Sequence, residues 1–337
     1  MFSDKYKKLI MFPLLLLLCV FCIPGCGRKA SVDDGKYHVV CTIFPAYDWA
    51  RNIIGDSDRI ELTLLVDNGV DLHSYQPTAD DVITIADCDL FVHVGGESDA
   101  WVSDVIKESG NKDMKILNMM DILADDIKTE EIIEGMQSNH NHDHEQEHDH
   151  DGADEDEEYD EHVWLSIANA VKCSQAFTGV LCELDEENCD LYIRNCNIYV
   201  DKLEGEYVKY VRTLSTATYD TILVGDRFPF RYLVNDFDIK YYAAYVGCSA
   251  ETEASFDTIR FLVNKVDKLD LPAVIVTESD NKALAKTIIE NSSDKERAVL
   301  VMDSMQSVTA KDIEAGTTYL SVMEDNLAVL ERALGCE

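Results

Sequence analysis

Two histidines lie in short polar motifs whose residue types suit metal binding. His73 lies in the segment 71–78, which reads DLHSYQPT, and His162 lies in the segment 160–166, which reads DEHVWLS. Imidazole nitrogen is a common ligand of Zn²⁺, and a closed zinc site needs four ligands. One histidine alone is more often an ordinary surface or core residue, so the pair suggests half of a metal site and needs further ligands.

Acidic residues occupy comparable places in the second half of the chain. Asp226, Glu278 and Asp303 each follow a short apolar run that we expect to be a strand. Each alone is weak evidence, because acids at strand ends are also common helix N-caps. Two histidines from one half and one or two of these carboxylates from the other would make a four-ligand site and offset the charge of a divalent ion.

A histidine- and acid-rich segment, 138–161, lies between the two halves. It contains His140, His142, His144, His148 and His150, and it has no Lys or Arg. Such a segment is too polar to pack, so we expect a mobile loop. The alternation of His and carboxylate favours weak capture of a borderline-soft ion such as Zn²⁺ over a merely solvated acidic loop.

Short apolar runs alternate with helical patterns on both sides of this segment. We expect strands at Val39–Phe44, Ile60–Val66, Leu90–Val94, Met114–Leu117, Thr221–Val224, Tyr241–Tyr245, Ala273–Thr277 and Ala298–Met302. This rhythm is typical of βαβ units with mostly parallel sheets. Between the two sets, Ser166–Thr216 is helical throughout, with a break near 184–187. The sequence predicts an α/β fold of two lobes, with ligands bound in the cleft at the carboxyl ends of the strands.

The N-terminus reads as a targeting segment. Three lysines precede the apolar run Leu9–Ile23, which is short for a membrane span and typical of a signal peptide. The run ends at Ile23-Pro24-Gly25-Cys26, which resembles a bacterial lipobox and implies a lipidated Cys26. An uncleaved anchor helix is the alternative. Both interpretations place the rest of the chain outside the cytoplasm, tethered to a membrane.

The net charge limits the possible functions, and the spacing of the cysteines limits the possible disulfides. The 337 residues carry 65 acidic and 29 basic side chains, a formal net charge of −36, which argues against nucleic-acid binding. Cys182, Cys189 and Cys196 recur every seven residues, and on one helix they would lie about 10 Å apart, too far to bridge one another. We therefore expect buried free thiols for these and for the other cysteines of the mature chain.

The two histidine motifs resemble those of the zinc/manganese solute-binding lipoproteins of ABC importers. The family pattern Asp-x-His-x-Tyr-Glu-Pro-Thr matches 71–78 except at Gln76, and Asp-Pro-His-Val-Trp-Leu matches 160–165 except at Glu161. The family's closing Asp lies in a motif that 302–305 matches. The resemblance covers essentially the whole mature chain. It implies a metal site between two lobes joined by a long rigid helix, with His73, His162 and Asp303 as ligands.

The third ligand of the family has no counterpart in this chain. It is His in zinc members and Glu in manganese members, three positions before a Phe, and that place holds Gly225 before Phe228. Asp226 could take over, or Arg227 could hold Asp226 in an ion pair and leave Glu278 or a water as ligand. The affinity order of divalent ions favours Zn²⁺ as the metal, although two His and two carboxylates would also suit Mn²⁺.

The resemblance implies a binding protein and not an enzyme. It would be the lipid-anchored, monomeric component of a metal importer on the outer face of the cell membrane, delivering Zn²⁺ to a permease and its ATPase. The expected organisation is a signal peptide (1–25), a lipid anchor and tether (26–36), an N-terminal lobe (37–182) carrying the loop 138–161, a linking helix (183–217) and a C-terminal lobe (218–337).

Two other functions remain open at this point. A secreted zinc hydrolase would use the open position that the missing third ligand leaves. However, the sequence has no Gly-x-Ser-x-Gly motif. Its one His-Glu-x-x-His match, 144–148, lies in the polar segment that we expect to be a loop, whereas that motif binds zinc from a helix. A surface adhesin that has lost metal transport is supported only by Gly225.

Overall fold

The computed structural model describes residues 35–137, 158–249, 253–278 and 282–337, and Lys36–Glu337 forms one compact unit. Three predicted features lie outside the described residues: the signal peptide over 1–25, the lipidated Cys26, and the loop histidines His140, His142, His144, His148 and His150. Within the described part, none of the helices combines the length and apolar character that a membrane span needs.

The first lobe is built on a four-stranded parallel sheet. In spatial order its strands are β2 (Ile60–Leu64), β1 (Tyr37–Cys41), β3 (Leu90–His93) and β4 (Lys115–Asn118). The helices that alternate with these strands are α2 (Phe44–Ile54), α3 (Ala79–Ala86), α4 (Val102–Ser109) and α5 (Met119–Ile122). All four residues of β3 are buried, as expected for the centre of a sheet that is covered on both faces.

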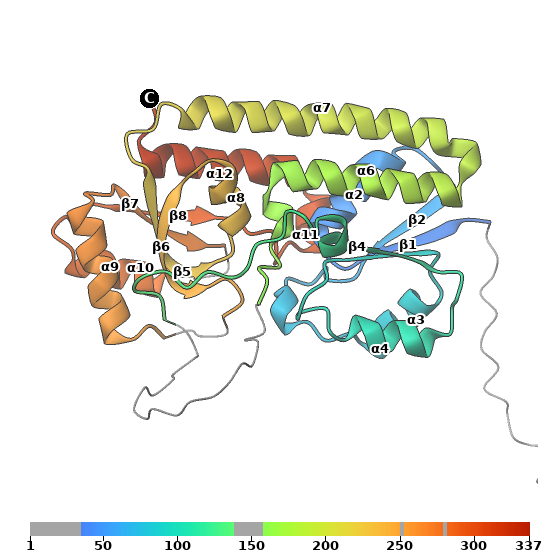
Figure 1. The fold of residues 1–337 in the computed structure, drawn as a ribbon, viewed down its shortest axis with the longest axis horizontal. Coiled ribbons are helices and arrows are strands. Elements are labelled where there is room, and N and C mark those ends of the chain that lie inside the picture. Colours follow the sequence, from blue (N-terminus) through green and yellow to red (C-terminus); the bar gives the residue numbers. More distant parts are fainter. Residues whose placement is uncertain (1–34, 138–157, 250–252, 279–281) are drawn as a thin grey trace, which may run out of the picture. The chain divides into compact units, whose positions relative to one another are not determined.

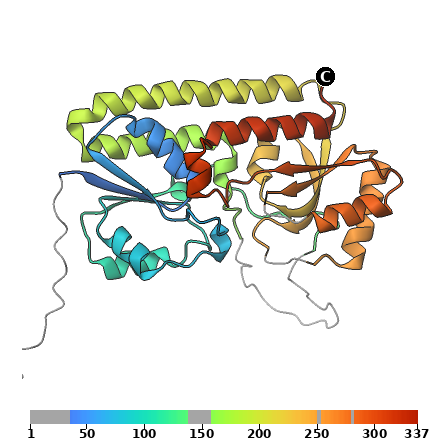
Figure 2. The same cartoon turned by 180° about the vertical axis from the view of Figure 1, so that it is seen from behind.

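The second lobe repeats the same topology. In spatial order its strands are β6 (Lys240–Val246), β5 (Thr221–Phe228), β7 (Ala273–Thr277) and β8 (Ala298–Met302), again all parallel. The accompanying helices are α8 (Arg231–Asp236), α9 (Phe256–Lys268), α10 (Ala283–Asn291), α11 (Ala310–Glu314) and α12 (Tyr319–Leu334). The predicted fold class, two α/β lobes with parallel sheets flanked by helices, is confirmed (Figures 1 and 2).

A layer of long helices runs along both lobes. The part of the chain where we expected a linking helix, 183–217, contains a short 3₁₀ turn, η3 (Glu186–Asn188), and α7 (Cys189–Leu214). The 26 residues of α7 span about 39 Å, and α7 lies over α6 (Ile167–Leu184) and α12 (Figure 1). Near its two ends, the Tyr192 hydroxyl donates to Asp185 and the Tyr210 hydroxyl to the Met323 carbonyl.

The cysteine expectation is wrong for one pair. Cys182 and Cys189 form a disulfide, with their Cα atoms 4.5 Å apart. They do not share one helix, because α6 ends at Leu184 and the chain turns back through η3 into α7. Cys196 does lie buried as a free thiol, as do Cys41, Cys88 and Cys173.

Candidate metal centre

The first histidine sits on a 3₁₀ turn after β2. This turn, η1 (Leu72–Ser74), begins at Asp71, whose Oδ1 accepts a hydrogen bond of 3.0 Å from the backbone N–H of His73. Leu72 anchors the turn in the core with 1% exposure. His73 Nδ1 lies 2.6 Å from Ser98 Oγ. The imidazole is therefore held at both its backbone and its Nδ1 atom, which leaves Nε2 for a ligand.

The second histidine sits on a matching turn before α6. This turn, η2 (Val163–Leu165), follows His162, whose backbone N–H donates to Asp160 Oδ1. The same carboxylate oxygen lies 2.9 Å from His162 Nδ1, so that in the neutral imidazole Nε2 carries the lone pair. The turn is clamped by Trp164, whose Nε1 donates to the Ser304 carbonyl and whose own carbonyl accepts from the Tyr319 hydroxyl. Two contacts with the second half of the chain therefore position His162.

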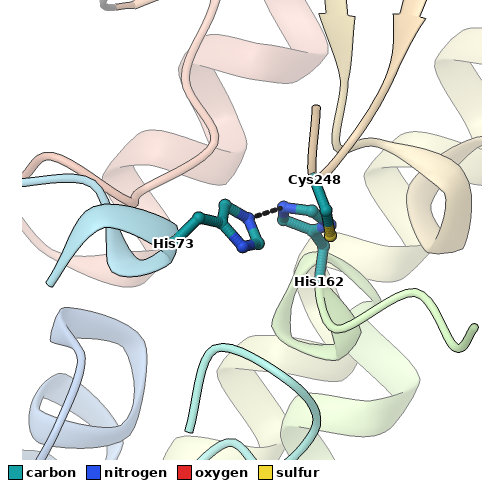
Figure 3. Close-up of side chains that lie close together, drawn as sticks. All are labelled: His73, His162 and Cys248. Carbon is teal, nitrogen blue, oxygen red and sulfur yellow. Dashed lines mark hydrogen bonds between the residues drawn. The ribbon is translucent and has the colours of Figure 1, made fainter. Parts of the chain in front are cut away.

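The two imidazoles meet with their Nε2 atoms 3.2 Å apart (Figure 3). If each Nδ1 donates to its oxygen partner, Ser98 Oγ or Asp160 Oδ1, two lone pairs face each other, an arrangement that a cation between them would stabilise. Two nitrogens bound to one tetrahedral zinc ion at about 2.0–2.1 Å would lie about 3.4 Å apart. The observed separation fits that requirement with a shift of a few tenths of an ångström.

The two histidines differ in electrostatics. The pKa of His73 is lowered to about 4, chiefly by burial and then by the nearby His162, while Asp71 opposes the shift. For His162, which is fully buried, burial also disfavours the charged form, but the charge and the hydrogen bond of Asp160 outweigh burial and raise the pKa. His73 is therefore neutral at physiological pH and available as a ligand.

A residue that the sequence interpretation passed over lies beside the two histidines. One ligand atom each of His73, His162 and Cys248 lies within 4.8 Å of the other two (Figure 3). Cys248 follows β6 by two positions, so it stands at a strand end just as Asp226 and Asp303 were expected to. The signal was present in the sequence, because Cys is a zinc ligand. We interpreted Cys248 as a buried apolar thiol, the commoner state.

Acidic side chains line the cavity that leads to these possible ligand atoms. His73 and Cys248 line a cavity of about 230 Å³, together with Ser98, Tyr159, Glu97, Glu130, Glu158 and Glu161. Glu130 Oε1 accepts from the backbone N–H of Cys248, and burial raises the pKa of the Glu130 and Glu161 carboxyl groups as well as that of the Cys248 thiol. A cleft lined by carboxylates attracts divalent cations.

The acidic residues expected as ligands have other partners. Asp226 Oδ2 accepts hydrogen bonds from the backbone N–H and the hydroxyl of Thr277. Asp303 Oδ1 accepts from the Met305 N–H, and burial, followed by the nearby charge of Glu278, raises the pKa of Asp303 to about 7. Neither belongs to the group around His73, so their assignment as ligands stays a prediction.

Glu278 and Arg227, the other residues weighed for the third ligand, are also engaged. Glu278 accepts from the hydroxyl and the N–H of Ser304. Arg227 forms an ion pair of 2.8 Å with Asp71, and not with Asp226 as considered above. A cation from the second lobe therefore neutralises the carboxylate at the start of the His73 turn.

Comparisons with known proteins identify the family of this chain. A family model described as the periplasmic component A of the zinc-uptake complex, ZnuA, matches residues 39–333. The zinc-binding lipoprotein AdcA of Streptococcus pneumoniae is 29% identical over 323 residues, which cover 95% of this chain and 60% of AdcA. The high-affinity zinc uptake system protein ZnuA of Bacillus subtilis is 26% identical over 325 residues, covering 95% and 96%. The chain thus spans about 60% of the length of the streptococcal relative.

A solved structure of a relative is similar to this chain in three dimensions. The crystal structure of the Zn(II)-bound ZnuA-like domain of AdcA from Streptococcus pneumoniae matches with a TM-score of 0.69 at 26% identity, covering 89% of this chain and 99% of that one. The match of the family to residues 39–333 takes in both lobes and both histidine motifs of this chain. The chain belongs to the family of the periplasmic component A of zinc-uptake complexes.

Proposed function

We propose that this protein captures Zn²⁺ outside the cytoplasmic membrane and delivers it to the permease of an ABC importer. One observation carries the proposal: Nε2 atoms from two motifs 89 residues apart face each other at 3.2 Å. Each imidazole is oriented through its other nitrogen, by Ser98 or by Asp160. Partners of this kind are typical of ligating histidines.

The roles of the residues follow from their contacts. His73 and His162 bind the ion as neutral imidazoles, and Asp160 increases the basicity of His162. The carboxylates of the cavity, among them Glu130 and Glu161, concentrate cations at its opening. No residue is required to act as a nucleophile or general base, so the proposal is binding and release without catalysis.

The partners and location extend the same proposal. The family name, a periplasmic component of a zinc-uptake complex, supports a membrane permease and its ATPase as partners. The leader ending in Cys26 supports attachment to the outer face of the membrane by a lipid, and the AdcA relative is named a lipoprotein. The histidines of 138–161 would gather ions near the cavity, and the protein would act as a monomer.

The test is a zinc titration of the full-length chain against a chromophoric chelator strong enough to mask weak sites. We expect one tight site in the wild-type protein. His73→Ala and His162→Ala should each weaken it by roughly 100-fold or more, because loss of a ligand should exceed the 10–100-fold cost of losing an outer partner.

The matched control is His38→Ala. His38 is 40% exposed and lies near the amino end of β1, away from the carboxyl ends that carry the site. It should leave the tight site unchanged. A wild-type protein with weak sites alone, or a tight site that survives both His73→Ala and His162→Ala, would contradict the proposal.

A further inference from the structure

The second lobe must contribute to the site through a residue other than Gly225. A Cβ built on Gly225 would lie 3.1 Å from Val274 and 3.2 Å from Ala285, so this position faces the core under α10. Asp226, the next residue, accepts a hydrogen bond at its Oδ2 from the backbone N–H of Thr277. Neither residue of β5 therefore belongs to the group of possible ligand atoms around His73 and His162.

The loop after β6 approaches the histidines instead. A Cβ on Gly247 would lie 2.9 Å from His162 Cε1, closer than real side-chain carbons come. Glycine thus allows the backbone at the end of β6 to pack directly against the imidazole. This close approach brings the next residue, Cys248, to within 4.8 Å of the ligand atoms of His73 and His162.

We propose that Cys248 is the third protein ligand and that the resulting set of two imidazoles and one thiolate selects zinc over manganese. This inference rests on the proposed function, since it names the ligand and the selectivity of the same site. Thiolate is a soft ligand that favours Zn²⁺, whereas Mn²⁺ prefers oxygen ligands. The softness of Cys248 would replace the preference that the missing third histidine gives in zinc members.

Binding through Cys248 has a defined chemical balance. The S–H bond breaks, a metal–sulfur bond forms and the proton leaves to the solvent, with no change of oxidation state. The charge of the ion drives this deprotonation. In a tetrahedral site, sulfur at about 2.3 Å and nitrogen at about 2.0–2.1 Å from zinc lie about 3.6 Å apart. The three atoms, at most 4.8 Å apart, need to close by about 1 Å.

Three protein ligands leave one position of a tetrahedral ion open. A water in that position can exchange with another ligand, as at zinc sites that are not purely structural. The cavity of about 230 Å³ reaches His73 and Cys248, so solvent has access to the position. An exchangeable position suits an ion that is bound only to be passed on.

The test uses Co²⁺ as a spectroscopic substitute for zinc in the full-length protein. A cobalt–thiolate bond gives a charge-transfer band in the near ultraviolet, and imidazole or carboxylate ligands do not. The segment 138–161 contains no cysteine, so ions bound there are silent. We expect the band in the wild-type protein and its loss in Cys248→Ser, together with a zinc Kd raised roughly 100-fold or more and a Mn²⁺ Kd changed by less than about 10-fold.

Cys336→Ser is the matched control, because Cys336 is also a free and partly exposed thiol but lies at the C-terminus. It should keep the band and the zinc affinity. A wild-type protein that binds zinc tightly through both histidines but shows no band, or a Cys248→Ser variant with unchanged zinc affinity, would overturn this inference alone. Absence of any tight site in the wild-type protein would overturn the proposed function together with it.

Discussion

The η1 and η2 turns share one local design and differ in what surrounds it. In both, an Asp two positions before the histidine accepts a hydrogen bond from the histidine N–H, at 3.0 Å for Asp71 and 2.9 Å for Asp160. The carboxylate of Asp160 also forms a hydrogen bond with the imidazole Nδ1 of its own histidine. The second oxygen of Asp71 instead accepts a hydrogen bond from Arg227 of the other lobe.

This difference separates the charges of the two imidazoles. Asp160 is left to stabilise a positive charge on His162, whereas Arg227 adds a positive charge near His73 and lowers its pKa. Asp71 itself is partly buried, which opposes its charge, yet Arg227 and His73 keep its pKa low. A motif of three residues therefore specifies each turn. The partner that the fold brings to its Asp determines the pKa of the histidine.

The largest expected effect concerns the acid stability of the metal-free protein. The pKa of His73 is about 4 in the folded state against an ordinary value of 6.5, so the unfolded chain binds more protons between these pH values. The contribution of neutral His73 to stability is present above pH 6.5 and is lost as the pH falls to 4, by about 3 kcal/mol. Urea unfolding of the wild-type protein and of His73→Gln between pH 7 and pH 4 measures it.

The comparison with the variant matters because other groups titrate in the same range. Asp303, with a raised pKa of about 7, stabilises the fold as the pH falls, and it remains in both proteins. The wild-type protein should lose more stability than His73→Gln on acidification. Equal losses in the two proteins would show that His73 does not carry the effect.

The next effect tests the two carboxylates directly. Asp160→Asn keeps the shape of the side chain but removes the charge that makes His162 more basic, so zinc affinity should fall by roughly 10–100-fold. Asp71→Asn removes a carboxylate that Arg227 already neutralises, so it should cost only a few-fold. Chelator competition on both variants measures the difference. Equal losses would remove the distinction between the turns.

The smallest effect comes from the cation itself. Arg227 and Asp71 are 23% and 22% exposed, so solvent screens their interaction. Arg227→Gln should raise zinc affinity by at most about fivefold, because it removes a positive charge near His73 and frees the charge of Asp71. Arg227→Lys keeps the positive charge and should leave the zinc affinity unchanged. The gain should shrink at high salt, and a loss of affinity in Arg227→Gln would show that the ion pair supports the closed site.

Much of the fold could be predicted because its signals are local. The apolar runs at 221–224 and 273–277 read as strands from their composition, and both are strands in parallel sheets. The break near 184–187 was also visible, yet its consequence was missed. A turn between two helices brings Cys182 to Cys189, and the spacing of seven residues suggested a separation along one helix.

The sequence by itself determined the α/β class, the two strand sets and the two histidine motifs, because periodicity and Asp-x-His turns depend on neighbouring residues. Only the tertiary structure decided which residue of the second lobe meets the histidines. The approach of Cys248, the engagement of Asp226 by Thr277 and the pairing of Arg227 with Asp71 join residues 51 to 175 positions apart. Such contacts depend on how the two lobes pack and on where each strand end points, which no local pattern specifies.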